Sequence, residues 1–258
     1  MSTALVTGAS GGLGEQFAWL LAADHHDLVL VARSKEKLEI LAQKLSEKYK
    51  VSATVLAHDL SREDSVRLLV SELEEKNIAI DILINNAGFG AYGKFHETTY
   101  DHEKQLIDVN IGALTELTKA LLPSMVKSGS GRILNVASTA AFQPGPLMAV
   151  YYASKSYVMN LSIALSEELR GTGVTVTCLC PGPTKTGFEV SAGLQGSRLF
   201  KSALMDAGTV ARIGYQAMLR GKPLVIAGFR NKLSAFGTRI VPRWLTARVA
   251  MAVQSPIA

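Results

Sequence analysis

Short apolar stretches alternate along the chain with longer segments in which apolar residues recur every three or four positions. The apolar stretches are rich in Val, Ile and Leu, which is typical of strands that are buried on both faces. They predict strands at Ala4–Thr7, Asp27–Ala32, Val51–Ala57, Asp81–Asn85, Arg132–Val136, Val174–Cys180 and Leu224–Ala227. The segments between them predict helices at Gly12–Asp24, Ser34–Tyr49, Arg62–Lys76, Tyr100–Val126, Val150–Arg170 and Thr209–Leu219.

This regular alternation of strands and helices predicts an α/β fold. Parallel strands joined by right-handed helical crossovers form a doubly wound sheet of the Rossmann type, with helices on both faces. No linker or internal repeat interrupts the pattern, and 258 residues suit one large α/β domain. We therefore expect a single domain over residues 1–228 that includes the substrate site, and a helical appendage over residues 229–258.

Composition places the chain among ordinary globular proteins. With 48% hydrophobic and 19% charged residues, it is neither disordered nor a disulfide scaffold. No apolar run approaches the length of a membrane span, and no basic, apolar leader precedes the first strand. Cys178 and Cys180 alternate along one predicted strand and are expected to be buried thiols. These features predict a cytoplasmic protein in a reducing compartment.

Charge is distributed unevenly along the chain. The net charge is +5, but residues 207–258 contain eight basic and no acidic residues. The remaining residues carry 19 basic and 22 acidic side chains, so the basic excess belongs to the C-terminal fifth. No nucleic-acid recognition motif accompanies this basic excess, and we expect no nucleic-acid partner.

A glycine-rich segment joins the first predicted strand to the first predicted helix. In it, Gly8 permits a tight turn, Gly12 lets the backbone approach a pyrophosphate, and Gly14 lets the helix pack close to the sheet. The helix N-terminus adds free N–H groups and a partial positive charge. We therefore expect a dinucleotide to bind at Gly8, Ser10, Gly11, Gly12, Leu13 and Gly14.

Arg33 stands at the end of the second predicted strand, where an acidic residue usually binds the 2′-hydroxyl of NAD. A guanidinium suits a 2′-phosphate instead, through bidentate, charge-assisted hydrogen bonds. The sequence thus predicts NADP(H) as the cofactor in preference to NAD(H). The alternative is a surface arginine that does not contact the cofactor.

Further motifs follow the glycine-rich segment in a fixed order. They are Asn85-Asn86-Ala87-Gly88 after the fourth strand, Asn110 in the long fourth helix, Ser138 after the fifth strand, the pair Tyr151 and Lys155, and Pro181-Gly182-Pro183-Thr184-Lys185-Thr186 after the sixth strand. Together these motifs cover about residues 3–186. In this order and spacing the chain resembles the short-chain dehydrogenase/reductase family, and among its members those that prefer NADP.

The resemblance implies roles for residues around the cofactor. Asp59 and Leu60 would bracket the adenine, and Asp59 would equally serve as a cap for the helix that begins near Arg62. The resemblance places further cofactor contacts at Asn85, Ala87, Gly88, Pro181, Gly182, Thr184 and Thr186. Of these, the two threonines would hold the nicotinamide carboxamide and the neighbouring phosphate.

Reduction of a carbonyl by hydride requires an acid that protonates the developing alkoxide. The ordinary pKa of a tyrosine phenol is about 10, and a neighbouring cation lowers it by favouring the phenolate. Tyr151 and Lys155 are four residues apart and therefore share one face of a helix. By resemblance, Ser138 would hydrogen-bond the substrate oxygen, Asn110 would anchor a water that leads protons to Lys155, and Lys155 would reach the ribose.

Tyr152 is a second candidate for the acid, because it lies three residues before Lys155. The offset of 13 residues between Ser138 and Tyr151 matches the family pattern and favours Tyr151. The five histidines are scattered without metal-ligand spacing, so we expect no metal site.

These observations together predict an NADP-dependent carbonyl reductase or alcohol dehydrogenase. A catalytically silent NADP-binding regulator or scaffold is one alternative, and an epimerase or dehydratase on the same fold is another. The expected pocket residues are mostly apolar and favour an apolar or bulky carbonyl or alcohol: Phe89, Tyr92, Ala140, Phe142, Leu194, Leu199 and Phe200. The stretch over residues 187–206 is expected to form a flap that lines the pocket, and its Arg198 and Lys201 leave room for an acyl chain with an anionic handle. The family resemblance further implies a homodimer or homotetramer.

The C-terminal tail carries a separate signal. Leu233, Phe236 and Ile240 fall on one helical face, and Pro242 begins a second predicted helix that presents Trp244. Basic residues interleave with these apolar ones. We favour a lid over the substrate entrance or a docking site for a sister subunit, with membrane-surface contact as the alternative.

Overall fold

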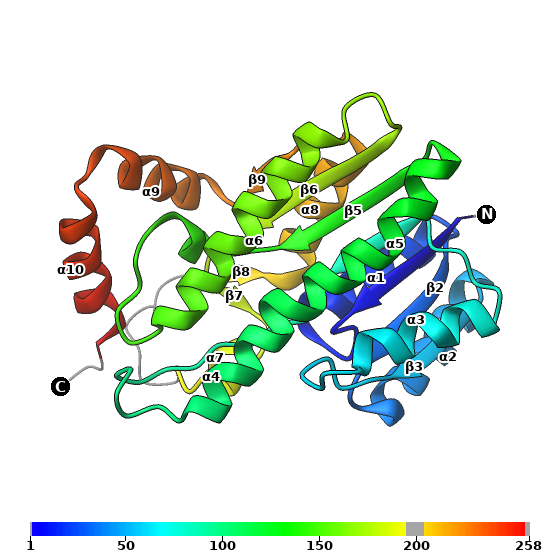
Figure 1. Cartoon of the computed structure of the whole chain (residues 1–258), viewed down its shortest axis with the longest axis horizontal. Helices are drawn as coiled ribbons and strands as arrows, with labels where there is room; N and C mark the ends of the chain where they lie inside the picture. The colour runs from blue at the N-terminus through cyan, green and yellow to red at the C-terminus, as the bar shows by residue number, and fades with distance from the viewer. Residues whose placement is uncertain (1, 195–203, 256–258) are drawn as a thin grey trace.

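The computed structural model describes residues 2–194 and 204–255. Seven strands form one parallel sheet in the order β3-β2-β1-β4-β5-β6-β9. The strands are β1 (Thr3–Thr7), β2 (Asp27–Ala32), β3 (Ala53–Ala57), β4 (Ile82–Asn85), β5 (Gly131–Val136), β6 (Val174–Cys180) and β9 (Leu224–Ile226). This arrangement confirms the predicted doubly wound α/β fold (Figure 1).

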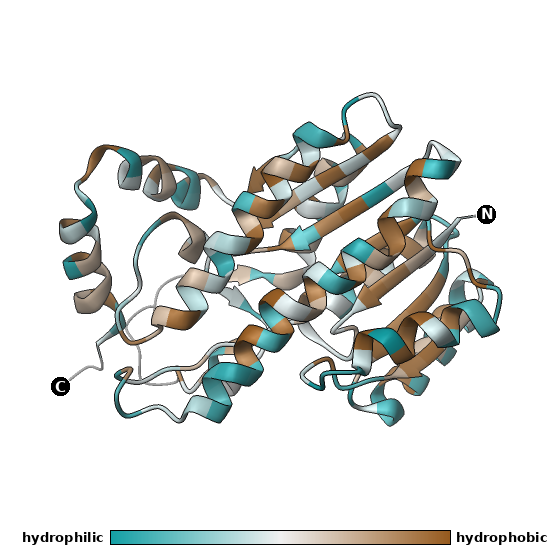
Figure 2. Ribbon diagram, viewed as in Figure 1, coloured by the Kyte–Doolittle hydropathy of each residue, from teal (hydrophilic) through white to brown (hydrophobic). Residues whose placement is uncertain are grey.

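Helices cover both faces of the sheet. They are α1 (Gly12–Ala23), α2 (Lys35–Tyr49), α3 (Ser65–Glu75), α4 (Tyr100–Ile107), α5 (Leu114–Ser128), α6 (Ala149–Glu168), α7 (Phe188–Ser191), α8 (Ala207–Leu219), α9 (Phe229–Ile240) and α10 (Arg243–Gln254). Phe17, Leu38 and Met218 from α1, α2 and α8 pack in one core. Leu69 and Leu117 from α3 and α5 pack in a second core on the opposite face. Because both faces are covered, β1 and β2 are apolar almost throughout (Figure 2).

The order of the strands reverses between β1 and β4. Strands β2 and β3 follow on one side of β1, whereas β4, β5 and β6 follow on the other. The loops that leave the carboxyl ends of β1 and β4 therefore separate, and such a switch point is the usual ligand site of an open parallel sheet.

The long fourth helix differs from its prediction. A π-helical turn, η1 (Asp108–Ala113), joins α4 to α5. Hydrophobic periodicity continues through such a turn, so the pattern alone does not reveal it, although π-turns are frequent at functional sites. Further elements of the described chain were not predicted from the sequence: the 3₁₀ turn η2 (Thr139–Phe142), the short helix α7 and the two-residue strands β7 (Thr184–Lys185) and β8 (Met205–Asp206).

The C-terminal tail forms the two helices that its sequence predicts, and Pro242 stands directly before α10. Both helices lie at the end of the molecule towards which the strands point (Figure 1). Among residues 2–194 and 204–255, no helix is long and apolar enough to cross a membrane.

Candidate active site

The glycine-rich segment forms a tight cradle at the end of β1. Gly8 has a φ of 66°, and a Cβ built there would lie 2.8 Å from the Nδ2 atom of Asn86. The same Nδ2 donates to the carbonyl oxygens of Thr7 and Gly8, at 2.9 and 3.2 Å. A Cβ on Gly14 would overlap the carbonyl oxygen of Gly8. Side chains are therefore excluded at these positions, and the backbone stays open to a ligand.

This cradle fits a dinucleotide pyrophosphate. The first turn of α1 offers its free N–H groups beside the loop, and no side chain from Gly8 or Gly14 intervenes. Gly8, Ser10, Gly11, Gly12 and Leu13 all line one cavity of about 700 Å³. Gly14 lies behind them and sets the closeness of α1 to β1.

The region expected to hold the adenosine is more open. Arg33 is exposed and lies outside the cavity wall, but its charge helps to hold the pKa of Asp59 low. Burial by itself would raise the pKa of Asp59, and hydrogen bonds from Ser61 together with nearby arginines outweigh it. Leu60 is buried in the core. Lys37, which was not among the predicted residues, lines the cavity.

Asp59 accepts hydrogen bonds from the backbone N–H and hydroxyl of Ser61, at 3.1 and 2.8 Å. These bonds shape the turn that precedes α3. Asp59 therefore holds this turn and does not cap α3, which begins at Ser65 after Asp64. Leu60 does not line the large cavity.

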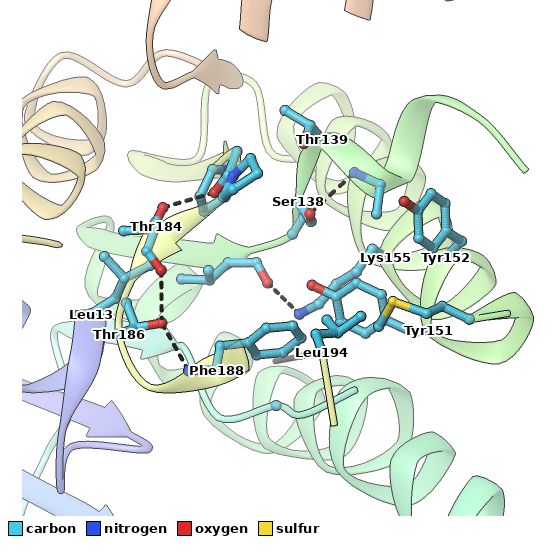
Figure 3. Close-up of a pocket in the computed structure, with 18 of the residues that line it drawn as sticks. Leu13, Ser138, Thr139, Tyr151, Tyr152, Lys155, Thr184, Thr186, Phe188 and Leu194 are labelled. Carbon is cyan, nitrogen blue, oxygen red and sulfur yellow. Dashed lines mark hydrogen bonds between the residues drawn. The ribbon is translucent and has the colours of Figure 1, made fainter. Parts of the chain in front are cut away.

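Ser138, Tyr151 and Lys155 meet in the same cavity (Figure 3). Ser138 follows β5, while Tyr151 and Lys155 lie one turn apart on α6. The Ser138 side chain is hydrogen-bonded to Tyr151. The Nζ atom of Lys155 donates to the carbonyl oxygen of Val136 at 2.9 Å and lies 5.8 Å from the centre of the Tyr151 ring. The three residues that the sequence proposes as catalytic are thus brought together.

Burial dominates the electrostatics of this group. It raises the pKa of Tyr151 well above the ordinary value, while the hydrogen bond from Ser138 acts in the opposite direction. The expectation that the pKa of Tyr151 is lowered is therefore wrong for the protein by itself, because desolvation of the phenolate has the largest effect. Burial also lowers the pKa of Lys155 to about 8, since a charged ammonium loses its hydration there. Tyr151 consequently keeps its proton at neutral pH, as a proton donor must.

Tyr152 lies in the cavity with different partners. Its hydroxyl accepts a hydrogen bond from the Nε2 atom of Gln254 at 3.1 Å and is also bonded to Gln143. Burial raises the pKa of Tyr152 to about 12. Because Ser138 bonds to Tyr151 and not to Tyr152 among these contacts, the geometry favours the same tyrosine as the sequence does.

Asn110 lies in the π-turn η1, behind the catalytic group. It accepts from the N–H of Phe89 at 3.1 Å and donates to the carbonyl of Phe89 and to the hydroxyl of Ser154, both at 3.0 Å. A Cβ on Gly88 would lie 2.9 Å from the Oδ1 atom of Asn110 and 3.3 Å from the Nζ atom of Lys155. Asn110 thus holds the β4 loop against α6, close to Lys155.

The two neighbouring asparagines at the end of β4 have different surroundings, and only one of them lines the cavity. Asn85 is buried and donates to Thr118 and Asn135, both at 2.9 Å, so it does not reach the cavity. Asn86, which the prediction passed over, lines the cavity together with Ala87 and Gly88. Asn85 ends strand β4 and points into the sheet layer, whereas Asn86 follows the strand and is turned towards the glycine loop.

The segment after β6 closes the other side of the cavity. Its lining residues are Pro181, Gly182, Pro183, Thr184 and Thr186. The hydroxyl of Thr184 donates to the carbonyl of Gly182 at 2.8 Å. Thr186 in turn accepts from the backbone N–H of Phe188 at 3.3 Å, which links this segment to α7 (Figure 3).

The substrate end of the cavity is lined mainly by apolar side chains. Of the residues predicted for it, Ala140 and Leu194 line the wall. Phe89, Tyr92 and Phe142 pack in adjacent apolar clusters instead. Leu199 and Phe200, like Arg198 and Lys201, lie outside the described residues. Phe188, in the stretch 187–206 predicted to line the pocket, is part of the wall. Wall residues that the prediction missed are Met148, Val249, Ala250 and Val253.

The tail helices complete this end of the cavity. Asn231, Ser234, Ala235 and Thr238 of α9 and Gln254 of α10 line it. Gln254 is 1% exposed, and its carbonyl accepts from the hydroxyl of Tyr92 at 2.7 Å. Its Oε1 atom has no hydrogen-bond partner within the described part of the chain.

A dinucleotide cradle that opens into a cavity with a buried tyrosine and lysine is the arrangement of an oxidoreductase that uses a nicotinamide cofactor. Comparison with known proteins agrees: the family model for short chain dehydrogenases matches residues 2–195. The chain belongs to the short-chain dehydrogenase/reductase family. Groups of His, Cys, Asp or Glu that could hold a metal ion do not occur over residues 2–194 and 204–255.

Several relatives cover nearly the whole chain. A very-long-chain 3-oxoacyl-CoA reductase from Bos taurus is 30% identical over 96% of this chain and 78% of its own length. A short-chain dehydrogenase from Sphingobium yanoikuyae, solved in complex with NADPH, superimposes with a TM-score of 0.84 at 34% identity, over 93% of this chain and 94% of its own. An alcohol dehydrogenase from Comamonas testosteroni that is specific for bulky-bulky ketones gives a TM-score of 0.79 at 29% identity, over 93% and 92%.

Proposed function

We propose that this protein is an NADP(H)-dependent carbonyl reductase or alcohol dehydrogenase that acts on apolar, bulky substrates. The observation that carries the proposal is the meeting of Ser138, Tyr151 and Lys155 in the cavity that also contains the glycine-rich cradle. A regulator or scaffold would have no use for a buried tyrosine and lysine beside a nucleotide site.

Three residues of this chain have separate roles in the reduction of a carbonyl. The nicotinamide supplies a hydride to the carbonyl carbon when it is bound. The hydroxyls of Ser138 and Tyr151 hydrogen-bond the carbonyl oxygen, and Tyr151 gives its proton to that oxygen as the C–H bond forms. Lys155, protonated below a pKa of about 8, stabilises the phenolate that remains. The product is a secondary alcohol, and the reverse sequence oxidises it.

Two basic residues support NADP(H) as the cofactor. Arg33 follows β2 at the edge where the adenosine ribose belongs, and Lys37 lines the cavity from the first turn of α2. Both cations would face a 2′-phosphate, and no acidic residue follows β2 directly to accept a 2′-hydroxyl. The NADPH complex of the Sphingobium relative supports the same choice.

The character of the cavity supports the substrate class. Its far end is lined by Met148, Phe188, Leu194, Val249 and Val253, together with the polar side chains of Gln254 and of Asn231, Ser234 and Thr238 on α9. Such a wall desolvates a large apolar body and orients it by few hydrogen bonds. The names of the Bos taurus and Comamonas relatives, an acyl-CoA reductase and an enzyme for bulky ketones, suggest which ketones to try first.

The direct test is a panel of ketones and 3-oxoacyl thioesters, assayed with NADPH and with NADH in parallel. We expect turnover of bulky ketones with a clear preference for NADPH. Nucleotide binding without turnover of any carbonyl or alcohol would favour the regulator, and comparable kcat/KM values with the two cofactors would refute the NADP assignment.

Arg33→Asp tests the cofactor contact separately. The new carboxylate would repel a 2′-phosphate and accept a 2′-hydroxyl, so kcat/KM should fall for NADPH and rise for NADH. Lys37→Asp probes the second cation in the same way. Glu36→Asp on the same helix is the matched control, since it leaves the local charge unchanged. An unchanged cofactor ratio in both lysine and arginine variants would mean that neither residue contacts the ribose phosphate.

A further inference from the structure

The tail helices have two different faces. The face of α9 that carries Asn231, Ser234, Ala235 and Thr238 lines the cavity. The large apolar residues of α9 occupy other positions of the helix, so they do not line the cavity. If the tail served only as a lid, these apolar side chains would be expected to pack inward, where they would gain from burial.

The unused apolar residues form a stripe on α9. Phe229, Leu233, Phe236 and Ile240 follow one another at intervals of three or four residues and are 80%, 64%, 58% and 72% exposed. Trp244, at the start of α10, is 60% exposed. Five large side chains at this exposure in one short segment exceed the single apolar residues that are normal on a protein surface.

Basic residues alternate in the sequence with these apolar residues on α9 and α10. Arg230, Lys232, Arg239, Arg243 and Arg248 are all exposed, and none forms an ion pair with any residue of the described chain. The guanidinium of Arg248 lies 5.0 Å from the centre of the Trp244 ring. No acidic residue occurs from residue 207 to the end of the chain. We call these ten residues, five apolar and five basic, the docking face.

We propose that the docking face binds the surface of a lipid bilayer that contains anionic lipids. The apolar side chains would enter the region between headgroups and acyl chains, while the cations would remain among the phosphates. Arginine suits this position because its long apolar stem lies along apolar surface while its charge stays in the headgroup layer. The contact is superficial, since neither α9 nor α10 could span a membrane.

Charge favours an anionic lipid surface over a second copy of the chain as the partner of the docking face. Two docking faces that met across a twofold axis would bring ten cations together without an intervening anion, which is unfavourable. An anionic lipid surface, in contrast, complements every charge of the face. Apolar and electrostatic attraction then add, as stable surface binding requires when either one alone is weak.

The docking face lies beside the entrance of the cavity, and this position affects how a substrate reaches it. Val249 and Val253 of α10 line the cavity and are themselves 55% and 39% exposed, so the cavity reaches the surface beside the docking face. A bilayer held there would offer apolar compounds directly to the entrance. This delivery rests on the function proposed above, whereas binding of the bilayer does not.

Vesicle sedimentation tests the binding itself. The full-length protein is mixed with vesicles of phosphatidylcholine alone, or of phosphatidylcholine with phosphatidylglycerol, at low and high salt. We expect sedimentation with the anionic vesicles at low salt and a marked loss at high salt, because salt screens the five cations. Equal binding to both vesicle types, or none to either, would overturn the proposal.

A matched pair of double variants locates the contact. Arg239→Glu with Ile240→Ser reverses one charge and removes one apolar residue on the docking face. Lys44→Glu with Ile40→Ser makes the same kind of change on the surface of α2, at the opposite end of the molecule (Figure 1). The first should lower the vesicle partition coefficient at least about tenfold. The second should leave it unchanged, and both should retain the melting temperature within a few degrees.

The outcomes separate the alternatives. Equal loss of vesicle binding in both double variants would show a diffuse charge effect and refute a specific face. A change from dimer to monomer in sedimentation velocity, confined to the docking-face variant and without vesicle binding by the wild type, would assign the face to a second copy. Loss of vesicle binding with normal turnover of a water-soluble ketone would support the proposal and leave the proposed reaction intact.

Discussion

Lys155 provides a sharp test of the buried electrostatics. Its side chain is 5% exposed, and burial lowers its pKa from the ordinary 10.5 to about 8. In the unfolded chain the same lysine would titrate near its ordinary value. Substitution of Lys155 by Met removes this difference, while a flexible side chain of similar length still fills the space.

The difference in pKa makes stability depend on pH. Below pH 8 Lys155 is protonated in both states, whereas between pH 8 and 10.5 only the unfolded chain keeps the proton. Because the unfolded state then binds more protons, the free energy of unfolding rises with pH, by about 1.4 kcal/mol per unit. From pH 7.5 to 9.5 the wild type should therefore gain about 2 kcal/mol relative to Lys155→Met.

Urea unfolding of both proteins without nucleotide, at pH 7.5, 8.5 and 9.5, measures this gain. Taking the difference between the two proteins cancels the titration of other groups. Tyr151 does not disturb the comparison, since burial moves its pKa above this range. A difference that stays constant, or that falls as the pH rises, would refute the idea that burial disfavours the charged Lys155.

Two further predictions concern the cavity and its walls, and a third concerns the assembly of the protein. Gly14→Ala should abolish nucleotide binding in a fluorescence titration, because the added methyl overlaps the carbonyl oxygen of Gly8; near-normal affinity would contradict the tight cradle. Tyr92→Phe removes the hydrogen bond to the carbonyl of Gln254 and should raise KM for a bulky ketone about fivefold, with unchanged affinity for NADPH. An unchanged KM would show that this bond does not hold the end of α10. We also expect a homodimer or homotetramer in sedimentation velocity, and a monomer at micromolar concentration would contradict it.

The fold was predictable because its strands and helices have strong periodicity. Buried strands such as Leu28-Val29-Leu30-Val31 show continuous apolar character, and crossover rules leave few ways to connect them. Element ends moved by a few residues: α3 begins at Ser65 and not at Arg62. There the Asp59 carboxylate and Ser61 form a turn of their own before the helix, a local contact that periodicity does not express.

The candidate site was predictable at positions where the local geometry or chemistry accepts only one type of residue. Gly8 and Gly14 mark the cradle because a side chain would collide there, and the spacing of Tyr151 and Lys155 marks one helical face. Which of two neighbours faces a cavity is harder to infer. Asn85 turned out to bond Thr118 and Asn135 inside the protein, because the strand ends between Asn85 and Asn86.

Contacts between distant segments could not be predicted from the sequence. Gln254 meets Tyr152 across about a hundred positions of the chain, and Lys37 reaches the cavity from α2. The raised pKa of Tyr151 also depends on how completely the folded protein buries the phenol. Sequence spacing shows that Lys155 is a neighbour, but it does not show how much water either side chain loses.

Turnover by two tyrosine variants tests the central claim, that Tyr151 is the proton donor of a carbonyl reductase. Tyr151→Phe keeps the ring against Phe188 and removes only the hydroxyl that is bonded to Ser138. Its kcat with NADPH and a bulky ketone should fall at least about 10²-fold, while its affinity for NADPH stays nearly unchanged. Tyr152→Phe should keep kcat within a few fold of the wild type. Retained turnover in Tyr151→Phe, with the loss in Tyr152→Phe instead, would contradict the account.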